Sequence, residues 1–338
     1  MRGWLVAGLL CAASAAFAAP GAAITDASSP RPTRPVHTYS IVARDAATGD
    51  IGVAVQSHWF GVGPIVPWAE SGVGAVATQS FVDPEYGRRG LELMRTGRSA
   101  ADTLAALLAA DEQRDVRQVA MIDVQGRVAV HTGRMNIQAA GHHVGSGYSV
   151  QANLMRSDRV WPAMAKAFEG AKGDLAERLL AALDAAQAAG GDLRGKQSAA
   201  LVVVRATPSG KPWVDRLFDL RVDDSARPLE ELRRLVRVQR AYNHMNEGDL
   251  AVERKDHAAA LRAYATAARL LPGNLEIVYW HAVALVNMGR TDESLPLFRR
   301  VFAADRSWVT VTTRLPGAGL LPDDKALIAR VLATAPRR

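Results

Sequence analysis

The order in which strand-like and helix-like segments follow one another limits the folds open to this chain. Residues 38–44 and 51–57 alternate and are rich in β-branched side chains, and the turn-forming stretch DAATGD separates them, which predicts a hairpin. Further strands are predicted near residues 73–79, 118–123, 127–132, 147–152, 198–205 and 214–222. Up to residue 225, helical periodicity is found at residues 84–95, 99–110 and 158–189. Because strands and helices are grouped and do not strictly alternate, the order predicts a layered α+β domain with mostly antiparallel sheets.

The first 37 residues differ in composition from the rest of the chain. Residues 1–19 combine a short basic start, an apolar core and small residues near the end, which is typical of a signal peptide. The apolar core is too short to span a bilayer, although an uncleaved anchor or a buried first helix is the alternative. Residues 20–37 are rich in Ala, Pro, Ser and Thr and are predicted to be an extended linker. We therefore expect a periplasmic or secreted protein without a transmembrane anchor after signal cleavage.

Charge and cysteine content exclude several functional classes. The formal net charge is +7, and the basic residues occur singly or in pairs without forming a basic block. Such a distribution favours weak attraction to anionic polymers, so we expect no nucleic-acid partner. The only cysteine, Cys11, lies in the predicted signal peptide, so we predict no disulfide and no thiol nucleophile. We also predict no cofactor and no metal site, since the adjacent His142 and His143 would point to opposite faces of a strand.

Residues 226–338 are predicted to form a linker helix followed by helical repeats. Residues 228–239 are charged and amphipathic, and small and aromatic residues recur after them with a 34-residue period that relates Tyr264 to Phe298. This part resembles a pair of tetratricopeptide repeats with a degenerate second copy. The resemblance implies a groove that binds a protein or peptide partner. A helical bundle with coincidental spacing is the alternative.

The strongest candidate for chemistry is Thr38, at the start of the first predicted strand. When a Thr begins a mature chain, its own α-amine, which has a pKa near neutrality, serves as the general base for its hydroxyl. Common catalytic signatures are missing, including Gly-x-Ser-x-Gly, His-Glu-x-x-His and the phosphate-binding loop. The alternative is that Thr38 is only a β-branched residue that begins a strand.

Several runs between residues 38 and 225 closely resemble a bacterial family known as domain of unknown function 1028, which is assigned to the N-terminal-nucleophile (Ntn) hydrolase superfamily. The runs are TYSIVARD, IGVAVQSHWFGVG, VPWAESGVGAVATQSFVDPEYGRRGLELM, RDVRQVAMID, GYSVQANLM and GDLRGKQSAALVVV. The resemblance implies a four-layer αββα sandwich over residues 38–225 and a Thr38 that becomes N-terminal. It gives no substrate.

A nucleophilic Thr38 requires a second cut, because signal cleavage near Ala19 leaves Thr38 inside the chain. The cut would fall between His37 and Thr38, by autoproteolysis or by another protease. The chain is then predicted to hydrolyse an amide bond in a small-molecule or peptide substrate. Candidate polar groups of the pocket, with Asn153 as the expected oxyanion donor, are Ser57, His58, Gln79, Ser80, Asn153 and Ser198.

Two other functions remain open from the sequence. In the first, the N-terminal domain is catalytically silent and the chain recruits a protein or peptide through its repeats. In the second, the basic chain binds the cell wall. The oligomeric state also stays open, a homo-oligomer included.

Overall fold

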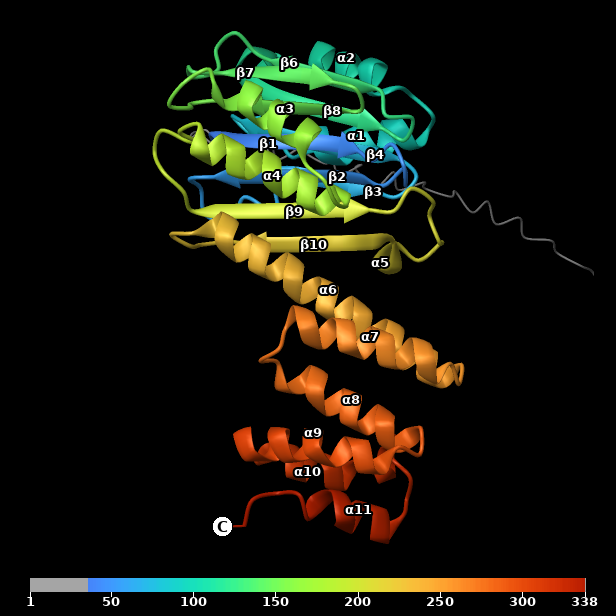
Figure 1. Ribbon diagram of the computed structural model, residues 1–338. Coiled ribbons are helices and arrows are strands. Elements are labelled where there is room, and N and C mark those ends of the chain that lie inside the picture. The colour runs from blue at the N-terminus through green and yellow to red at the C-terminus, as the bar shows by residue number, and fades with distance from the viewer. Residues whose placement is uncertain (1–35, 338) are drawn as a thin grey trace, which may run out of the picture. The chain divides into compact units, whose positions relative to one another are not determined.

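The computed structural model describes residues 36–337 (Figure 1). The predicted signal peptide at residues 1–19 and residues 20–35 of the predicted linker lie outside the described residues. The sequence predicts a linker up to His37, whereas Val36 and His37 are both buried in the folded part. Val36 forms an antiparallel bridge with Ser80, with both backbone N–H groups donating to the opposite carbonyl. The fold therefore begins before the first strand.

Two antiparallel sheets form the centre of the N-terminal region (Figure 1). The larger sheet has the order β10-β9-β2-β1-β8-β7, with the strands β1 (Thr38–Arg44), β2 (Ile51–Ser57), β7 (Gly141–Gly145), β8 (Tyr148–Ala152), β9 (Ser198–Val204) and β10 (Arg216–Val222). The smaller sheet has the order β3-β4-β5-β6, with β3 (Pro67–Glu70), β4 (Gly74–Ser80), β5 (Arg117–Asp123) and β6 (Val128–Thr132).

The two sheets face each other, and alternation along each strand decides which side chains lie between them. Val42, Val53, Ala75 and Ile122 belong to the apolar core between the sheets. Towards the N-terminal end of β1, the same inward positions become polar, beginning with Thr38. The sequence alternation therefore builds an apolar interior at one end of the sandwich and a buried polar interior at the other.

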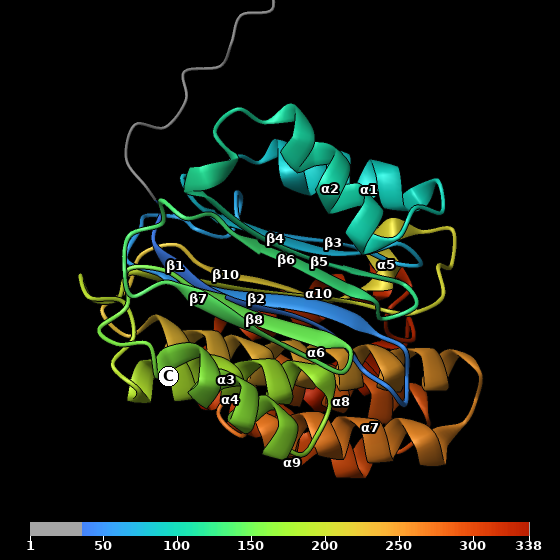
Figure 2. The ribbon, with the colours of Figure 1, turned by 90° about the horizontal axis from the view of Figure 1, so that it is seen from above.

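Helices cover the outer faces of both sheets, as Figure 2 shows. Helices α1 (Glu85–Arg95) and α2 (Ala100–Ala110) pack on β4 and β5 of the smaller sheet. Helices α3 (Val160–Gly170) and α4 (Leu175–Ala188) pack on the larger sheet. Ser99 and Asp174 begin α2 and α4 by accepting a hydrogen bond from the backbone three residues later. The short elements η1 (Arg114–Val116) and α5 (Pro212–Asp215) precede β5 and β10.

The C-terminal region is entirely helical within the described residues. Its elements are α6 (Pro228–Glu253), α7 (His257–Leu270), α8 (Leu275–Asn287), α9 (Thr291–Ala304), α10 (Ser307–Arg314), η2 (Pro316–Ala318) and α11 (Lys325–Leu332). Gly248 lets the ring of Tyr264 approach α6, since a Cβ atom there would lie 2.9 Å from the ring. Phe298 is fully buried at the equivalent position of the next helix pair. Within residues 36–337, no helix has the length and apolar character needed to cross a bilayer.

The predicted antiparallel sheets and all-helical C-terminal region are confirmed, while three elements differ from prediction. Strand β3 begins at Pro67 and β7 carries His142 and His143, and both lie outside the strands predicted from the sequence. Both are edge strands, which lack the long apolar alternation of central strands. The predicted linker helix at residues 228–239 continues to Glu253, so that α6 also forms the first helix of the repeat region.

Candidate functional site

Thr38 lies at the first position of β1, opposite Ser57 on β2. Both side chains point between the sheets and are fully buried. Thr38 Oγ1 is 2.9 Å from the carbonyl oxygen of Val36 and 3.2 Å from Ser57 Oγ, so its single proton has two acceptors within reach. The predicted hairpin therefore brings two hydroxyl groups into direct contact.

The carbonyl of His37, which belongs to the peptide bond immediately before Thr38, accepts two side-chain hydrogen bonds. Ser57 Oγ donates to it over 2.6 Å, and Arg194 Nη2 donates over 2.8 Å. A hydroxyl and a guanidinium on one carbonyl oxygen stabilise negative charge that develops there during acyl transfer. The arrangement is thus that of an oxyanion site formed around a bond of the chain itself.

Asp192 holds Arg194 in this position. Its carboxylate is fully buried and accepts hydrogen bonds from Arg194 Nη2 at 2.7 Å and Arg194 Nε at 3.1 Å. The backbone N–H groups of Arg194 and His58 also donate to it. A buried carboxylate with this many donors fixes the guanidinium, which leaves the Nη2 group directed at the His37 carbonyl.

The remaining polar residues between the sheets form one buried hydrogen-bonded network. The two N–H groups of Gln118 Nε2 share three acceptor oxygens, those of Thr132, Gly141 and Ala152. Gln118 Oε1 accepts from Asn153 Nδ2 at 2.8 Å and from Gln79 Nε2 at 2.7 Å. Gln79 Oε1 in turn accepts from the hydroxyl of Ser40, to which Gln151 donates. Every amide orientation follows from its partners, so the network is directional.

Asn153 therefore faces His37 with its oxygen. Its Nδ2 group is engaged by Gln118, and its Oδ1 lies 2.8 Å from Nδ1 of His37. Asn153 is predicted from the sequence as an oxyanion donor; in this structure its Nδ2 contacts Gln118, while Ser57 and Arg194 donate to the His37 carbonyl. Burial lowers the pKa of His37, as does the charge of Arg194, whereas the hydrogen bond to Asn153 and the charge of Asp192 oppose the shift. Because Oδ1 of Asn153 can only accept, Nδ1 of His37 is the donor.

A pocket of about 530 Å³ opens beside His37. Its lining combines aromatic, aliphatic and polar side chains, namely His37, His58, Trp59, Phe60, Leu154, Arg194 and Gln197. Nδ1 of His58 is buried without a hydrogen-bond partner among the described residues. This pocket borders His37, the residue immediately before Thr38, and is large enough to receive a side chain.

The structure brings most of the predicted site residues to this end of the sandwich, with different tasks. Ser57 contacts Thr38, Gln79 donates to the Thr38 carbonyl, and Ser80 pairs with Val36. Ser198 Oγ contacts the backbone of Trp59 and Val62, which fixes the loop at the pocket rim.

The sequence argument missed four residues of the site, namely Gln118, Gln151, Asp192 and Arg194. Each lies in one of the runs that carry the family resemblance, but only the three-dimensional structure shows what it contacts.

His142 and His143 lie on β7 and do not line the pocket beside His37. His142 Nδ1 is 2.9 Å from the Thr132 hydroxyl, and His143 stacks on Tyr148. Among the described residues, no three His, Asp or Glu side chains are grouped to hold a metal ion.

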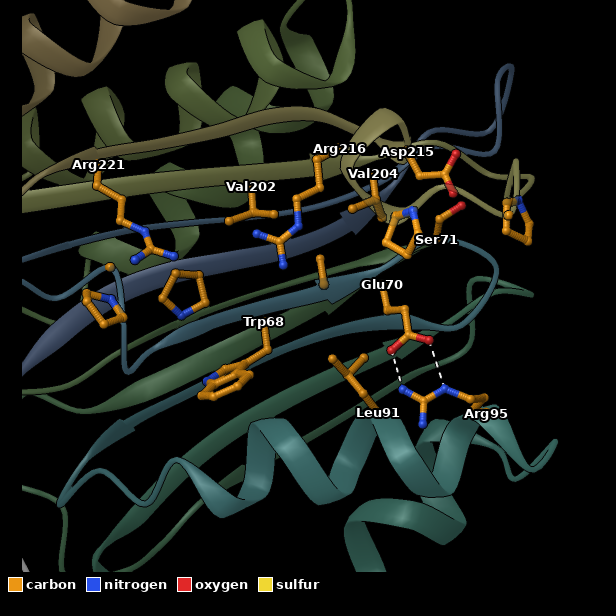
Figure 3. Close-up of a pocket in the computed structure, with 17 residues that line it drawn as sticks. Trp68, Glu70, Ser71, Leu91, Arg95, Val202, Val204, Asp215, Arg216 and Arg221 are labelled. Atoms are coloured by element: carbon orange, nitrogen blue, oxygen red, sulfur yellow. Dashed lines mark hydrogen bonds and ion pairs between the residues drawn. The ribbon is translucent and has the colours of Figure 1, made fainter.

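A second cavity, of about 550 Å³, lies under β10 (Figure 3). The smaller sheet ends at β3, which packs against β2 and β9, so β10 lies beyond its edge. The side chains of β10 that point inward are charged, whereas packing against an opposing strand would require apolar ones. Figure 3 shows Arg216 and Arg221 entering the cavity opposite Trp68 and the ion pair of Glu70 and Arg95. Arginines beside an aromatic ring suit a carboxylate-bearing molecule.

This second cavity offers no activated nucleophile. Its one hydroxyl, Ser71 Oγ, donates to the carbonyl of Arg205 over 2.8 Å. Its acidic groups are engaged by Arg95 and by the backbone of Ser209. None of the predicted site residues lines it. The cavity beside His37 is therefore the candidate reaction site.

The sequence profile of a family of unknown function, DUF1028, matches residues 38–232, and a tetratricopeptide-repeat profile matches residues 251–310. Among solved structures, the chain is similar to protein SPO2555 from Silicibacter pomeroyi, described as DUF1028, with 30% identity and a TM-score of 0.54. That similarity covers 59% of this chain and 88% of the other. No curated protein matches the chain.

Proposed function

The chain belongs to the DUF1028 family of unknown function, and from this premise we propose that it is an Ntn-type amidohydrolase with Thr38 as its N-terminal nucleophile. Two facing antiparallel sheets with helices on both outer faces are compatible with the αββα sandwich of that superfamily. The single observation that carries the proposal is the pair of donors, Ser57 and Arg194, on the carbonyl that precedes Thr38.

The proposed first reaction is cleavage of the chain by itself. Thr38 Oγ1 attacks the carbonyl carbon of His37, and Ser57 and Arg194 stabilise the negative charge on the carbonyl oxygen. The bond from that carbon to the Thr38 nitrogen then breaks, and the nitrogen takes up the hydroxyl proton. Water hydrolyses the resulting ester, which leaves a His37 carboxylate together with a free Thr38 amine and hydroxyl.

The mature enzyme repeats this chemistry on an external amide. The Thr38 amine, whose pKa as a free α-amine lies near neutrality, accepts the proton of the Thr38 hydroxyl as that oxygen attacks the substrate carbonyl. The same ammonium group protonates the departing amine, and water releases the acyl group from Thr38. Hydrogen bonds from Gln79 and from the backbone of Asn153 to the Thr38 carbonyl hold the residue during both steps.

The proposal includes the setting of the enzyme. It is exported to the periplasm or secreted after removal of residues 1–19, with an Ntn-type domain at residues 38–225 and a repeat domain at residues 226–338. The predicted small-molecule or peptide amide substrate and a homo-oligomeric state belong to the same proposal.

The test is the N-terminus of the protein purified from its natural host. Intact-mass measurement is expected to find a chain that begins at Thr38, with a Thr38→Ala variant retaining the preceding residues. Thr38→Ser keeps a hydroxyl and is expected to be cut. A natural protein that keeps residues 20–37 and still hydrolyses its substrate would refute the mechanism.

A second function rests on the C-terminal region. Repeats of the tetratricopeptide type suggest protein–protein interaction, and the matching profile covers residues 251–310. In this alternative the N-terminal domain is silent, and the chain recruits a protein or peptide through its repeats. Copurification with a partner that is lost when residues 251–310 are altered, from a chain that stays uncut, would favour it.

A further inference from the structure

We propose that this enzyme selects acyl groups whose side chain is neutral and planar and donates an N–H group, as a histidyl residue does, because Asn153 presents a fixed acceptor where that side chain lies. The inference rests on the proposed function and specifies its substrate class. It starts from the position of His37, which is the acyl residue of the first bond that Thr38 would cut.

His37 marks the acyl side of the site. Its carbonyl lies between the donors Ser57 and Arg194, where the carbonyl of an external substrate must also lie to be attacked by Thr38. Its side chain is 3% exposed and borders the pocket that contains Trp59 and Leu154. The residue therefore shows which way an acyl side chain points and what it meets.

The acceptor on Asn153 cannot turn into a donor without breaking the network behind it. Rotating the amide would place Oδ1 against Oε1 of Gln118, and Gln118 is itself fixed because only acceptor oxygens surround its Nε2 group. A side chain without a donor would leave Oδ1 of Asn153 buried and unpaired, which is unfavourable. The site therefore selects an acyl side chain that donates a hydrogen bond to Oδ1 of Asn153.

Charge around the pocket narrows the choice to neutral side chains. Burial at the position of His37 disfavours a cationic acyl side chain, and the repulsion from the Arg194 guanidinium on the same carbonyl exceeds the attraction of the Asp192 carboxylate. A carboxylate side chain would face Oδ1 of Asn153, an acceptor opposite an acceptor. An imidazole in its neutral form satisfies both conditions, as His37 does.

The experiment uses residue 37 of the full chain as the acyl donor. His37→Asn and His37→Leu place side chains of nearly equal shape at this position, but only asparagine donates an N–H group. Each precursor is synthesised in a cell-free system, and cleavage between residues 37 and 38 is followed by intact mass over time. We expect His37→Asn to be cut within a few-fold of the wild type, and His37→Leu to be cut about tenfold to a hundredfold more slowly.

Asn153→Leu tests whether the difference arises from the proposed acceptor. In that background, His37→Asn and His37→Leu are expected to be cut at equal rates. Thermal unfolding of each variant separates a lost acceptor from a lost fold, and the comparison of His37→Asn with His37→Leu in the wild-type background stands if Asn153→Leu does not fold. Chains that have been cut are then given histidine, asparagine and leucine p-nitroanilides, for which kcat/KM is expected to follow the same order.

The outcomes separate the two proposals. A wild-type precursor that is never cut refutes the Ntn mechanism and, with it, the inference. A wild-type precursor that is cut, with His37→Leu cut as fast as His37→Asn, refutes the acyl selectivity alone. The acyl selectivity is also refuted if the cut depends on residue 37 but kcat/KM for the anilides does not follow the same order. Oδ1 of Asn153 would then act only on the chain's own bond.

Discussion

Replacing Ser57 by alanine tests the oxyanion role at a single atom. Ser57 Oγ donates to the His37 carbonyl over 2.6 Å, and Arg194 Nη2 is the other side-chain donor. Loss of one donor from such a pair slows acyl transfer by about 10² to 10³, which corresponds to roughly 2.7–4 kcal/mol in the barrier. We expect the precursor of Ser57→Ala to be cut slower by this factor.

The same change has a small effect on folding. The His37 carbonyl keeps its bond from Arg194, and Thr38 Oγ1 keeps the carbonyl of Val36 as an acceptor at 2.9 Å. No buried polar atom is therefore left unpaired, and the loss of one neutral hydrogen bond lowers the free energy of unfolding by about 0.5–1.5 kcal/mol. The effect on the rate thus exceeds the effect on stability.

Ser294→Ala is the matched control. Ser294 is also fully buried, and its Oγ donates to a backbone carbonyl, that of Thr291, over 2.7 Å within α9 of the C-terminal helical region. Precursors of both variants are synthesised cell-free and followed by intact mass, with urea unfolding of each. If the two variants are cut at the same rate, the donor role of Ser57 is wrong.

Two further predictions concern residues outside the reaction site. Burial lowers the pKa of His281 below its usual 6.5, with Arg290 lowering it and Glu293 opposing it. Because the unfolded chain then binds the proton more readily, the free energy of unfolding falls as the pH drops through about 6.5 and levels off below the folded pKa. The melting temperature of the wild type should therefore decrease between pH 7.5 and 5, and that of His281→Leu should decrease less. An equal decrease in both proteins would contradict this prediction. In Gly87→Ala, the added Cβ would lie 2.3 Å from the Trp68 ring. Overpacking of about 1–3 kcal/mol outweighs the gain of about 1 kcal/mol in helix propensity, so the melting temperature should fall, and a rise would contradict the predicted clash.

Most of the regular structure could be predicted because the chain marks its elements locally. The hairpin at residues 38–57 alternates on both sides of a turn-forming stretch, and the long helical region breaks near Gly173 into α3 and α4. The profile matches confirm the DUF1028 resemblance and the tetratricopeptide-type region. The edge strands β3 and β7 could not be predicted, since pairing with a neighbouring strand, and not their own pattern, makes them strands.

Only those contacts of the candidate site that arise from local sequence patterns could be predicted. Thr38 and Ser57 meet because one hairpin sets their register, which the sequence indicates. Arg194 reaches the same carbonyl from 157 positions away along the chain, and no periodicity encodes that contact. The orientation of the Asn153 amide could not be predicted for a related reason. Whether its nitrogen or its oxygen faces His37 depends on Gln118, whose own orientation depends on residues of three strands.

The burial of the bond before Thr38 bears on what would cut it. The sequence leaves autoproteolysis and a separate protease as alternatives, and proteases preferentially cut exposed, mobile segments. Val36, His37 and Thr38 are at most 3% exposed, and Val36 is paired with Ser80 and packed in the core between the sheets. A separate protease could reach this bond only after these residues leave the fold, whereas Thr38 and Ser57 already lie beside it. If the bond is cut in the folded chain, the nucleophile is therefore supplied by the chain itself, and a cut that proceeds equally well in Thr38→Ala would show that the segment opens first.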